Sequence, residues 1–288
     1  MSSFVVHAPA KINYYLDILD RRPDGFHNLD TVFQALDWTD ELRIEVTSGP
    51  ADQLMVTGPF ANGVPANRSN LVLKALDHLR GESPSHLPWL SIQLTKSIPH
   101  GAGLGGGSSN AATLVKALNT HFQLGLSQER EHRLCATLGS DCPFFLRGGT
   151  QRSLGRGEIL KPVEQNRELH ILIAVSDEVV STAQAFAALR EPEKGSRTDS
   201  GAVLDWLAGR TDETPVLHNT FERGVAVAYP GVQRVLEGLR GTEPLAYRMS
   251  GSGSACFALY DNEAAALTAQ KQLEPLCRVT RVCRPITP

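Results

Sequence analysis

The feature that most constrains this chain is the stretch PHGAGLGGGSSNAATL, which occupies Pro99–Leu114. Five of the seven residues in Gly101–Gly107 are glycine. Such a stretch is compatible with a flexible linker, a structural turn or a loop that holds a phosphate. A linker is flexible because both of its ends can move. Here a strand pattern ends near Thr95 and an apolar helix stripe begins by Ala111, so both ends of the loop are anchored.

The loop also has the chemistry of an anion site. Ser108, Ser109 and Asn110 are favourable residue types at the start of a helix. A glycine-rich turn before a helix exposes several backbone N–H groups, backed by the positive end of the helix dipole. The usual P-loop does not fit, because no lysine precedes the two serines. The residues alone therefore favour phosphate binding over a structural turn, and they leave open which phosphate is bound.

Strand and helix patterns occur in both halves of the chain. Alternation of apolar residues predicts strands over Lys11–Ile18, Leu42–Val46 and Leu90–Leu94. A buried strand is predicted over Leu169–Val175, and another strand over Ala255–Tyr260, after a glycine-rich turn. Helical spacing predicts helices over Leu71–Leu79, Ala111–Phe122, Thr182–Leu189, Asn219–Ala228, Val232–Leu239 and Glu263–Leu273. The polar segment Glu191–Gly201 is typical of a loop. This mixture predicts an α+β fold, and we expect a boundary near residue 160, between domains 1–160 and 161–288.

Composition and charge exclude several classes of protein. A net charge of −3 over 288 residues, without a basic run, argues against nucleic-acid binding. Five cysteines without a CxxC pair argue against a disulfide framework and favour a reducing compartment. The N-terminal sequence does not have the pattern of a signal peptide, and the uncharged window Ser97–Val115 is too weakly apolar to span a bilayer. We expect a cytoplasmic protein, a monomer or weak homodimer, that binds a small molecule and neither nucleic acid nor membrane.

Five segments together resemble the motifs of a known family, the GHMP kinases. PHGAGLGGGSSNAA is similar to the family's second motif, P-x-G-x-G-L-G-G-S-S-x-A. APAKINYYLDILDRRPDGFH, SDCPFFLRGGTQRSLGRGE, HNTFE and MSGSGSACFALY resemble motifs of one branch of this family, in the same order and over about residues 8 to 260. The resemblance implies a two-domain GHMP kinase fold, with an N-terminal part like domain 2 of ribosomal protein S5 and a ferredoxin-like C-terminal part.

The same resemblance implies an activity. This branch transfers the γ-phosphate of ATP to the 2-hydroxyl of a methylerythritol that carries a cytidine diphosphate group, in the non-mevalonate route to isoprenoid precursors. Two other interpretations stay open: a GHMP kinase for an unlabelled small alcohol, and a non-catalytic nucleotide or RNA binder on the same fold. The near-neutral charge argues against RNA, and the presence of both Lys11 and Asp141 argues against an inactive kinase.

For the donor side, the resemblance implies that the glycine loop wraps the ATP phosphates and that Ser108 or Ser109 helps to hold Mg²⁺. Asn70 and Lys96 are expected near the adenine, and His100 is expected to line the edge of the loop. The expected ATP-binding residues of the loop are Pro99, His100, Gly101, Ala102, Gly103, Leu104, Gly105, Gly106, Gly107, Ser108 and Ser109.

For the reaction itself, two residues stand out. By themselves, Asp141 is typical of a helix N-cap and Lys11 of a solvated strand lysine. The resemblance implies that Asp141 is the catalytic base, which takes or aligns the proton of the acceptor hydroxyl. It implies that Lys11 stabilises negative charge at that hydroxyl, and that Asn13, on the same strand face, binds the acceptor.

For the cytidine end of the acceptor, the segment after the Pro23–Gly25 turn is informative. Phe26 and His27 are by themselves typical of turn residues that pack over a small cluster. The resemblance implies that Phe26 stacks on the cytosine and His27 hydrogen-bonds its edge, with Phe186 on the other side and Thr182 nearby.

The chain departs from the branch's motifs at four positions. Phe26 replaces the usual tyrosine, which keeps the ring and removes the hydroxyl, and Ser140 replaces an alanine. Cys142 replaces a valine, and Thr220 replaces an aspartate.

Overall fold

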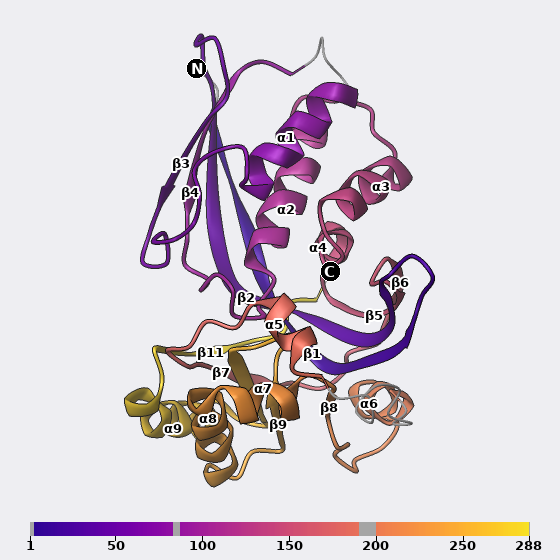
Figure 1. Ribbon diagram of the computed structural model, residues 1–288, viewed down its shortest axis with the longest axis vertical. Helices are drawn as coiled ribbons and strands as arrows, with labels where there is room; N and C mark the ends of the chain where they lie inside the picture. Colours follow the sequence, from indigo (N-terminus) through magenta and orange to yellow (C-terminus); the bar gives the residue numbers. More distant parts are fainter. Residues whose placement is uncertain (1–2, 83–86, 190–199, 288) are drawn as a thin grey trace. The chain divides into compact units, whose positions relative to one another are not determined.

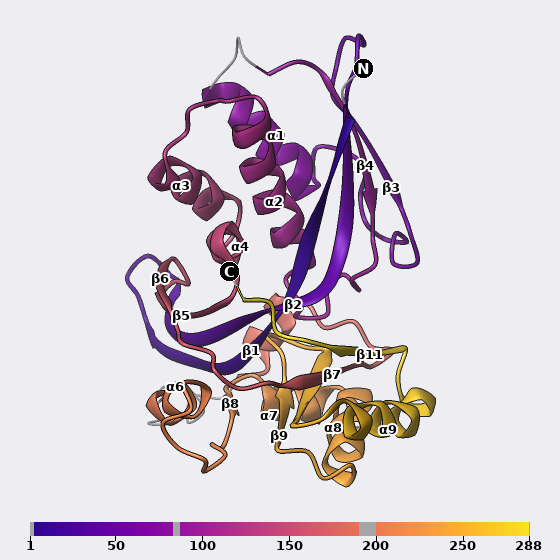
Figure 2. The same ribbon diagram turned by 180° about the vertical axis from the view of Figure 1, so that it is seen from behind.

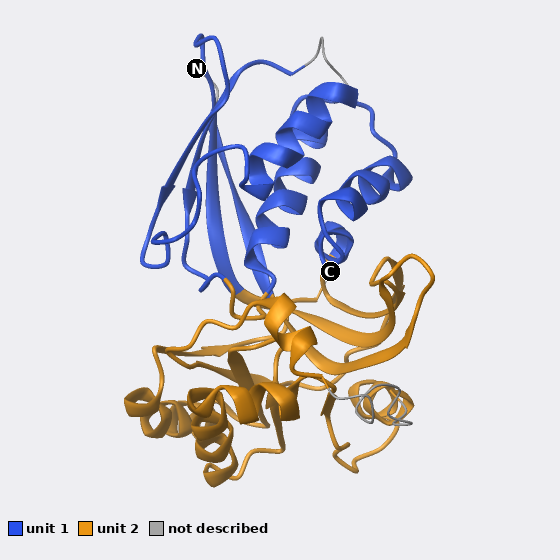
Figure 3. Ribbon diagram, in the orientation of Figure 1, with its two compact units in different colours: residues 1–10, 38–100, 105–147 blue, residues 11–37, 101–104, 148–288 orange. Residues whose placement is uncertain are grey.

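A computed structural model describes residues 3–82, 87–189 and 200–287 of the chain. Two compact units are present (Figure 3): unit 1 contains residues 1–10, 38–100 and 105–147, and unit 2 contains 11–37, 101–104 and 148–288. The long strands β1 (Ser3–Arg21) and β2 (His27–Val46) contribute residues to both units. Each unit is thus assembled from three stretches of chain. The domain boundary near residue 160 stays a prediction.

Unit 1 combines a sheet with helices. Strands β3 (Gln53–Thr57) and β4 (Leu90–Thr95) pair in parallel, and β4 pairs antiparallel with the second half of β2. Helices α1 (Leu71–Glu82), α2 (Gly106–His121), α3 (Gln128–Leu138) and α4 (Cys142–Arg147) lie on one side of these strands (Figures 1 and 2). Helix α1 confirms the helix predicted over Leu71–Leu79, and Val72, Ala75, Leu76 and Leu79 are buried on it.

Unit 2 contains a four-stranded antiparallel sheet. Its order is β11 (Val279–Cys283), β7 (His170–Val175), β10 (Ala255–Tyr260) and β9 (Ala246–Met249). Helices α8 (Pro230–Gly241) and α9 (Glu263–Leu273) pack against it, and a 3-10 turn, η2 (Glu274–Leu276), follows α9. A core of buried side chains lies between sheet and helices, as expected for a ferredoxin-like arrangement.

The rest of unit 2 is built on the first half of β2 and the second half of β1. Strand β5 (Thr150–Gly155) pairs with β2, and β6 (Ile159–Pro162) pairs with β5. The short strand β8 (His218–Asn219) runs parallel to β1. Helices α5 (Thr182–Ala187), α6 (Gly201–Leu207) and α7 (Glu222–Ala228) complete the unit. Sheets and helices in both units confirm the predicted α+β class.

Some predicted elements need correction. The helix expected over Asn219–Ala228 begins only at Glu222, because Asn219 belongs to β8 and its side-chain amide donates to the carbonyls of Met249 (2.7 Å) and Gly251 (2.9 Å). The loop expected over Glu191–Gly201 falls mostly on residues 190–199, outside the described residues. In the described ranges, no helix is long and apolar enough to cross a bilayer.

Candidate active site

The first half of the glycine loop lies in unit 2 and packs on the turn Ser250–Gly253. Gly103 has a φ of +77°, and a Cβ there would lie 2.1 Å from the carbonyl oxygen of Ser250, so no other residue fits without movement. The Ser250 hydroxyl donates to the Gly103 carbonyl (3.0 Å), and the Lys11 amide donates to the Leu104 carbonyl (2.9 Å). These backbone contacts fix the loop, and the linker interpretation is therefore wrong.

The second half of the loop leads into α2 in unit 1. Gly105 is the N-cap, with a left-handed φ of 69°, and none of the described side chains caps the helix. Ser108 is half-buried in the first turn. Ser109 is 0% exposed, and its hydroxyl has no hydrogen-bond partner within the described part of the chain. The first turn of α2 thus presents backbone amides and serine hydroxyls, which is the donor set of a phosphate site.

Asp40 fixes the backbone of Ser97 and Ile98, the two residues directly before the glycine loop. One carboxylate oxygen accepts the amides of Ser97 (2.7 Å) and Ile98 (2.8 Å). The other oxygen pairs with the Lys96 ammonium and accepts the Asn110 amide (3.0 Å). Lys96 is only 2% exposed and is tied to the first turn of α2. The sequence analysis missed Asp40, and the expectation that Lys96 lies near the adenine stays a prediction.

Asn70 and His100 each have a structural partner in unit 1. The Asn70 side-chain oxygen accepts the Val72 amide (2.9 Å) at the start of α1, and its amide donates to the Pro65 carbonyl (2.7 Å). The His100 Nε2 lies 2.9 Å from the Asn62 carbonyl oxygen. Asn70 therefore acts as a helix cap. Its expected contact with adenine stays a prediction.

Asp141 lies in the turn that directly precedes α4. The Cys142 amide donates to the Gly139 carbonyl (3.2 Å), which closes this turn. Ser108 hydrogen-bonds the Cys142 thiol, and a Cβ on Gly139 would lie 3.8 Å from the Ser108 Oγ. Burial raises the pKa of that thiol to about 12, so it stays neutral at physiological pH. Within unit 1, the structure brings the Asp141 turn beside the serines that end the glycine loop.

Lys11 lies on β1 in unit 2 and is 3% exposed, so its interpretation as a solvated strand lysine is wrong. Its ammonium donates to the Asn13 side-chain oxygen (2.8 Å), and the Asn13 amide donates to the Thr31 hydroxyl (2.7 Å). A Cβ on Gly251 would lie 3.2 Å from the Lys11 Nζ. Lys11 and Asn13 do share one strand face, which is buried, and Lys11 lies against the turn Ser250–Gly253, the second glycine turn.

The residues expected at the cytidine end lie in unit 2. The His27 ring stacks on the Phe186 ring of α5, with centroids 5.4 Å apart and an interplanar angle of 21°. The Thr182 Oγ1 lies 3.3 Å from the Ser252 Oγ, which connects α5 to the second glycine turn. Phe26 is half exposed, and one face of its ring is covered by Arg156, a residue that the sequence analysis missed. Recognition of cytosine by these rings stays a prediction.

The HNTFE segment supports the second glycine turn. Asn219 binds the carbonyl of Gly251 in this turn and that of Met249 just before it, and Glu222 accepts from the Arg248 guanidinium (2.8 Å) and the Met249 amide (2.8 Å). The Thr220 hydroxyl donates to the Asp17 carboxylate (3.0 Å). Because an aspartate at position 220 would place a second carboxylate there, threonine suits this chain.

Comparison with known proteins agrees with this geometry. The model of the GHMP kinases N terminal domain matches residues 70–149, and that of the GHMP kinases C terminal matches residues 205–276. The 4-diphosphocytidyl-2-C-methyl-D-erythritol kinase of Geobacter sulfurreducens is 35% identical, over 95% of this chain and 95% of that protein. The enzyme of the same name from Nocardia farcinica is 38% identical, over 94% of this chain and 90% of that protein.

Solved structures lead to the same family. A crystal structure of 4-(cytidine 5'-diphospho)-2C-methyl-D-erythritol kinase has a TM-score of 0.83 and 31% identity, and covers 98% of this chain and 99% of that chain. Homoserine kinase from Cytophaga hutchinsonii, at 18% identity, has a TM-score of 0.76 over 100% of this chain and 95% of its own, and so shares the fold. The expected GHMP kinase fold is thereby confirmed. The chain belongs to the GHMP kinases, within the family of 4-diphosphocytidyl-2-C-methyl-D-erythritol kinases.

Proposed function

We propose that this protein transfers the γ-phosphate of ATP to the 2-hydroxyl of 4-diphosphocytidyl-2-C-methyl-D-erythritol, in the non-mevalonate route to isoprenoid precursors. One observation above all supports this function. Within unit 2, the Lys11 backbone amide donates to the Leu104 carbonyl at the end of the loop's first half, and within unit 1 the serines of its second half lie beside the Asp141 turn. A phosphate loop with a lysine beside its first half and an aspartate beside its second half has the residue types that phosphoryl transfer to an alcohol needs.

On the donor side, the loop amides and the positive end of α2 bind the phosphates of ATP. The residues present also fit Mg²⁺, because the cation prefers oxygen ligands and usually shares them with substrate phosphates. The Ser108 or the buried, unpartnered Ser109 hydroxyl would hold it, and it would neutralise charge on those phosphates.

On the acceptor side, Asp141 accepts or aligns the proton of the 2-hydroxyl as its oxygen attacks the γ-phosphorus. Lys11 stabilises the negative charge that develops on that oxygen. The hydrogen bonds from Lys11 to Asn13 and from Asn13 to Thr31 fix its ammonium, so no reorganisation is needed during the reaction. Catalysis here is mainly positioning and electrostatic stabilisation.

At the far end of the acceptor, the rings of Phe26, His27 and Phe186 bind the cytosine. Stacking of a base on an aromatic side chain contributes about 1–3 kcal/mol. We propose the cytoplasm as the location, since all five cysteines are free thiols, and a monomer or weak homodimer as the assembly.

The acceptor specificity is tested by thermal stabilisation with nucleotides and by ATP consumption. We expect CDP to raise the melting temperature more than CMP, UDP or GDP, because the rings and His27 select a cytidine diphosphate. ATP consumption should require the CDP-linked alcohol. Equal turnover of methylerythritol without the nucleotide would instead indicate a kinase for unlabelled alcohols. Nucleotide binding without any turnover would indicate a non-catalytic binder.

A further inference from the structure

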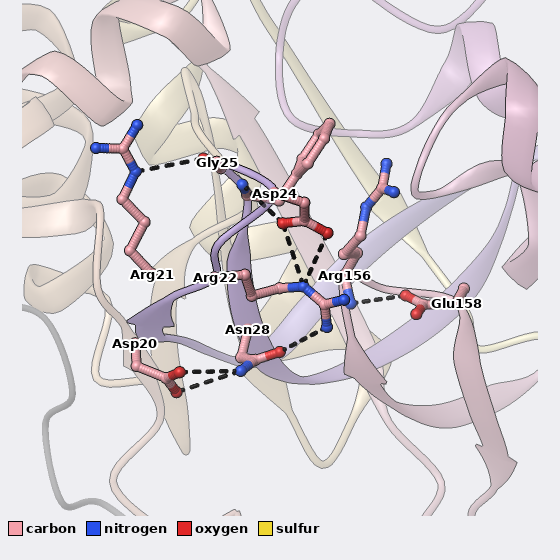
Figure 4. A network of polar contacts seen from close by, with 9 residues as sticks. Asp20, Arg21, Arg22, Asp24, Gly25, Asn28, Arg156 and Glu158 are labelled. Atoms are coloured by element: carbon pink, nitrogen blue, oxygen red, sulfur yellow. Dashed lines mark hydrogen bonds and ion pairs between the residues drawn. The ribbon is translucent and has the colours of Figure 1, made fainter.

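The turn that carries Phe26 is fixed by a cluster of charged and polar side chains in unit 2. Figure 4 shows the Asp24 carboxylate between the side chains of Arg22 and Arg156. Asp24 accepts from the Arg22 Nε (3.1 Å) and from the Phe26 amide (3.2 Å), and Arg22 also donates to Asn28 (3.1 Å). The Phe26 backbone amide is therefore fixed by the Asp24 carboxylate, and that carboxylate is in turn fixed by Arg22.

Arg156 projects from a second fixed turn, the hairpin between β5 and β6. It lies between Gly155 and Gly157, whose φ angles of +72° and +114° a side chain rarely adopts. The Arg156 amide donates to the Glu158 carboxylate (2.6 Å), and the Ser153 hydroxyl donates to the Gly157 carbonyl (2.7 Å). These contacts fix the backbone of the turn from which the Arg156 side chain extends.

The two turns meet through one contact between side chains. The Arg156 Cζ lies 3.7 Å from the centroid of the Phe26 ring, so the guanidinium lies against one face of the ring. The Phe26 side chain nevertheless remains 50% exposed, which leaves surface on its other side open. The Asp24 carboxylate also attracts the Arg156 guanidinium, so the guanidinium has two neighbours in this cluster, the carboxylate and the face of the Phe26 ring.

We propose that Arg156 is a positioning residue for the nucleotide end of the acceptor, acting through Phe26. This inference rests on the proposed function. The guanidinium covers one face of the Phe26 ring and fixes the ring, so that the open face stacks on the pyrimidine base. An exposed ring that is already ordered loses less side-chain freedom when the base binds, which increases affinity.

The contact between Arg156 and the ring matters more because position 26 carries phenylalanine, where the motif of this branch has tyrosine. Without the hydroxyl, the Phe26 ring has no hydrogen bond of its own through which a partner can orient it. Contact with its faces is then the remaining means of fixing its plane. A planar guanidinium stacks on a ring better than an ammonium, so arginine is the suitable residue at position 156.

The experiment compares Arg156→Ala with the parent protein in steady-state kinetics. We expect KM for the CDP-linked alcohol to rise about three- to tenfold, the range that a partly exposed cation–π contact supplies. The kcat and the KM for ATP should stay within about twofold, and the melting temperature should not change, because Arg156 lies on a surface turn. Arg156→Lys should recover part of the affinity. Arg21→Ala is the matched control: it removes an equal charge and one long, exposed hydrogen bond to the Gly25 carbonyl (3.5 Å) but no contact with the ring, so its KM for the CDP-linked alcohol should stay within about twofold of the parent.

A double-mutant cycle with Phe26→Leu separates positioning from direct contact. In the Phe26→Leu background, Arg156→Ala should have no further effect on CDP affinity measured by calorimetry. An unchanged KM in Arg156→Ala, or an equal loss of affinity in both backgrounds, would overturn the proposal. Failure of the proposed function is a different result, because the parent protein would then not phosphorylate the CDP-linked alcohol at all.

Discussion

At the scale of single residues, the candidate site is notable for polar side chains that are buried where solvent exposure would be usual. Lys11 and Asn13 are buried on β1, and Lys96 and Asp40 are buried beside the entrance to α2. Burial of a charged group is costly unless hydrogen bonds or ion pairs compensate it. A buried charged residue is therefore expected where its charge fixes a loop, as Asp40 and Lys96 do, or stabilises the charge that develops in a reaction, as proposed for Lys11.

The catalytic assignment predicts a specific loss. Asp141→Asn and Lys11→Met should each lower kcat at least about a hundredfold, because one removes the proton acceptor and the other the positive charge near the acceptor oxygen. Steady-state kinetics measure the loss, and circular dichroism with thermal unfolding checks that each variant folds. A kcat close to that of the parent protein in either variant would remove that residue from the mechanism.

Single residues also mark the limit of what the sequence predicts. Asp141 and the glycine loop were identified because they lie in contiguous motifs. Asp40 and Arg156 were missed because each acts on a partner far away in the chain: Asp40 on Lys96, 56 positions away, and Arg156 on Phe26. Nothing near Asp40 or Arg156 in the sequence indicates the partner, so only the fold reveals the pair.

At the scale of elements, prediction succeeded where the apolar residues are periodic or form an unbroken run. Helix α9 was predicted with the bounds that it has because its apolar residues are periodic, and strand β10 because all six of its residues are apolar or aromatic. The first half of β2 was missed. Its residues from Thr31 to Leu36 are buried on both faces, but the polar residues Thr31 and Gln34 are among them, so the segment shows neither alternation nor an unbroken apolar run.

The junction between β4, the glycine loop and α2 depends on Asp40. We expect Asp40→Asn to lower the free energy of unfolding by about 3–5 kcal/mol, because the buried Lys96 ammonium loses its carboxylate. Urea denaturation measures the change. The double variant Asp40→Asn/Lys96→Met should recover part of the stability, since no unpaired charge remains. A loss below about 1 kcal/mol in the single variant would show that the pair does not hold the junction.

At the scale of the whole molecule, the buried thiols make stability depend on pH at the alkaline end. Burial raises the pKa of Cys142 and Cys283 from 9.0 to about 12. The folded protein thus holds these protons more tightly than the unfolded chain does. The contribution of these protonated thiols to the free energy of unfolding is fully present below pH 9 and is lost as the pH rises from 9 to about 12.

We therefore expect urea denaturation to show lower stability at about pH 10.5 than at about pH 8, by about 2 kcal/mol for each of these thiols. The variant Cys142→Ala/Cys283→Ala separates this effect from the titration of lysine and tyrosine, and it should lose less stability over the same interval. An equal loss in the variant and the parent would mean that these thiols do not contribute.

The interleaving of the two units affects how the chain can be made and divided. The chain passes from one unit to the other five times, after residues 10, 37, 100, 104 and 147. During synthesis, residues 29–34 of β2 must wait for β5, which leaves the ribosome more than a hundred residues later. No single cut separates the units, so neither can be expressed alone as a continuous fragment. The glycine loop is itself divided, with residues 101–104 in one unit and 105–109 in the other. A break there would interrupt both units at once.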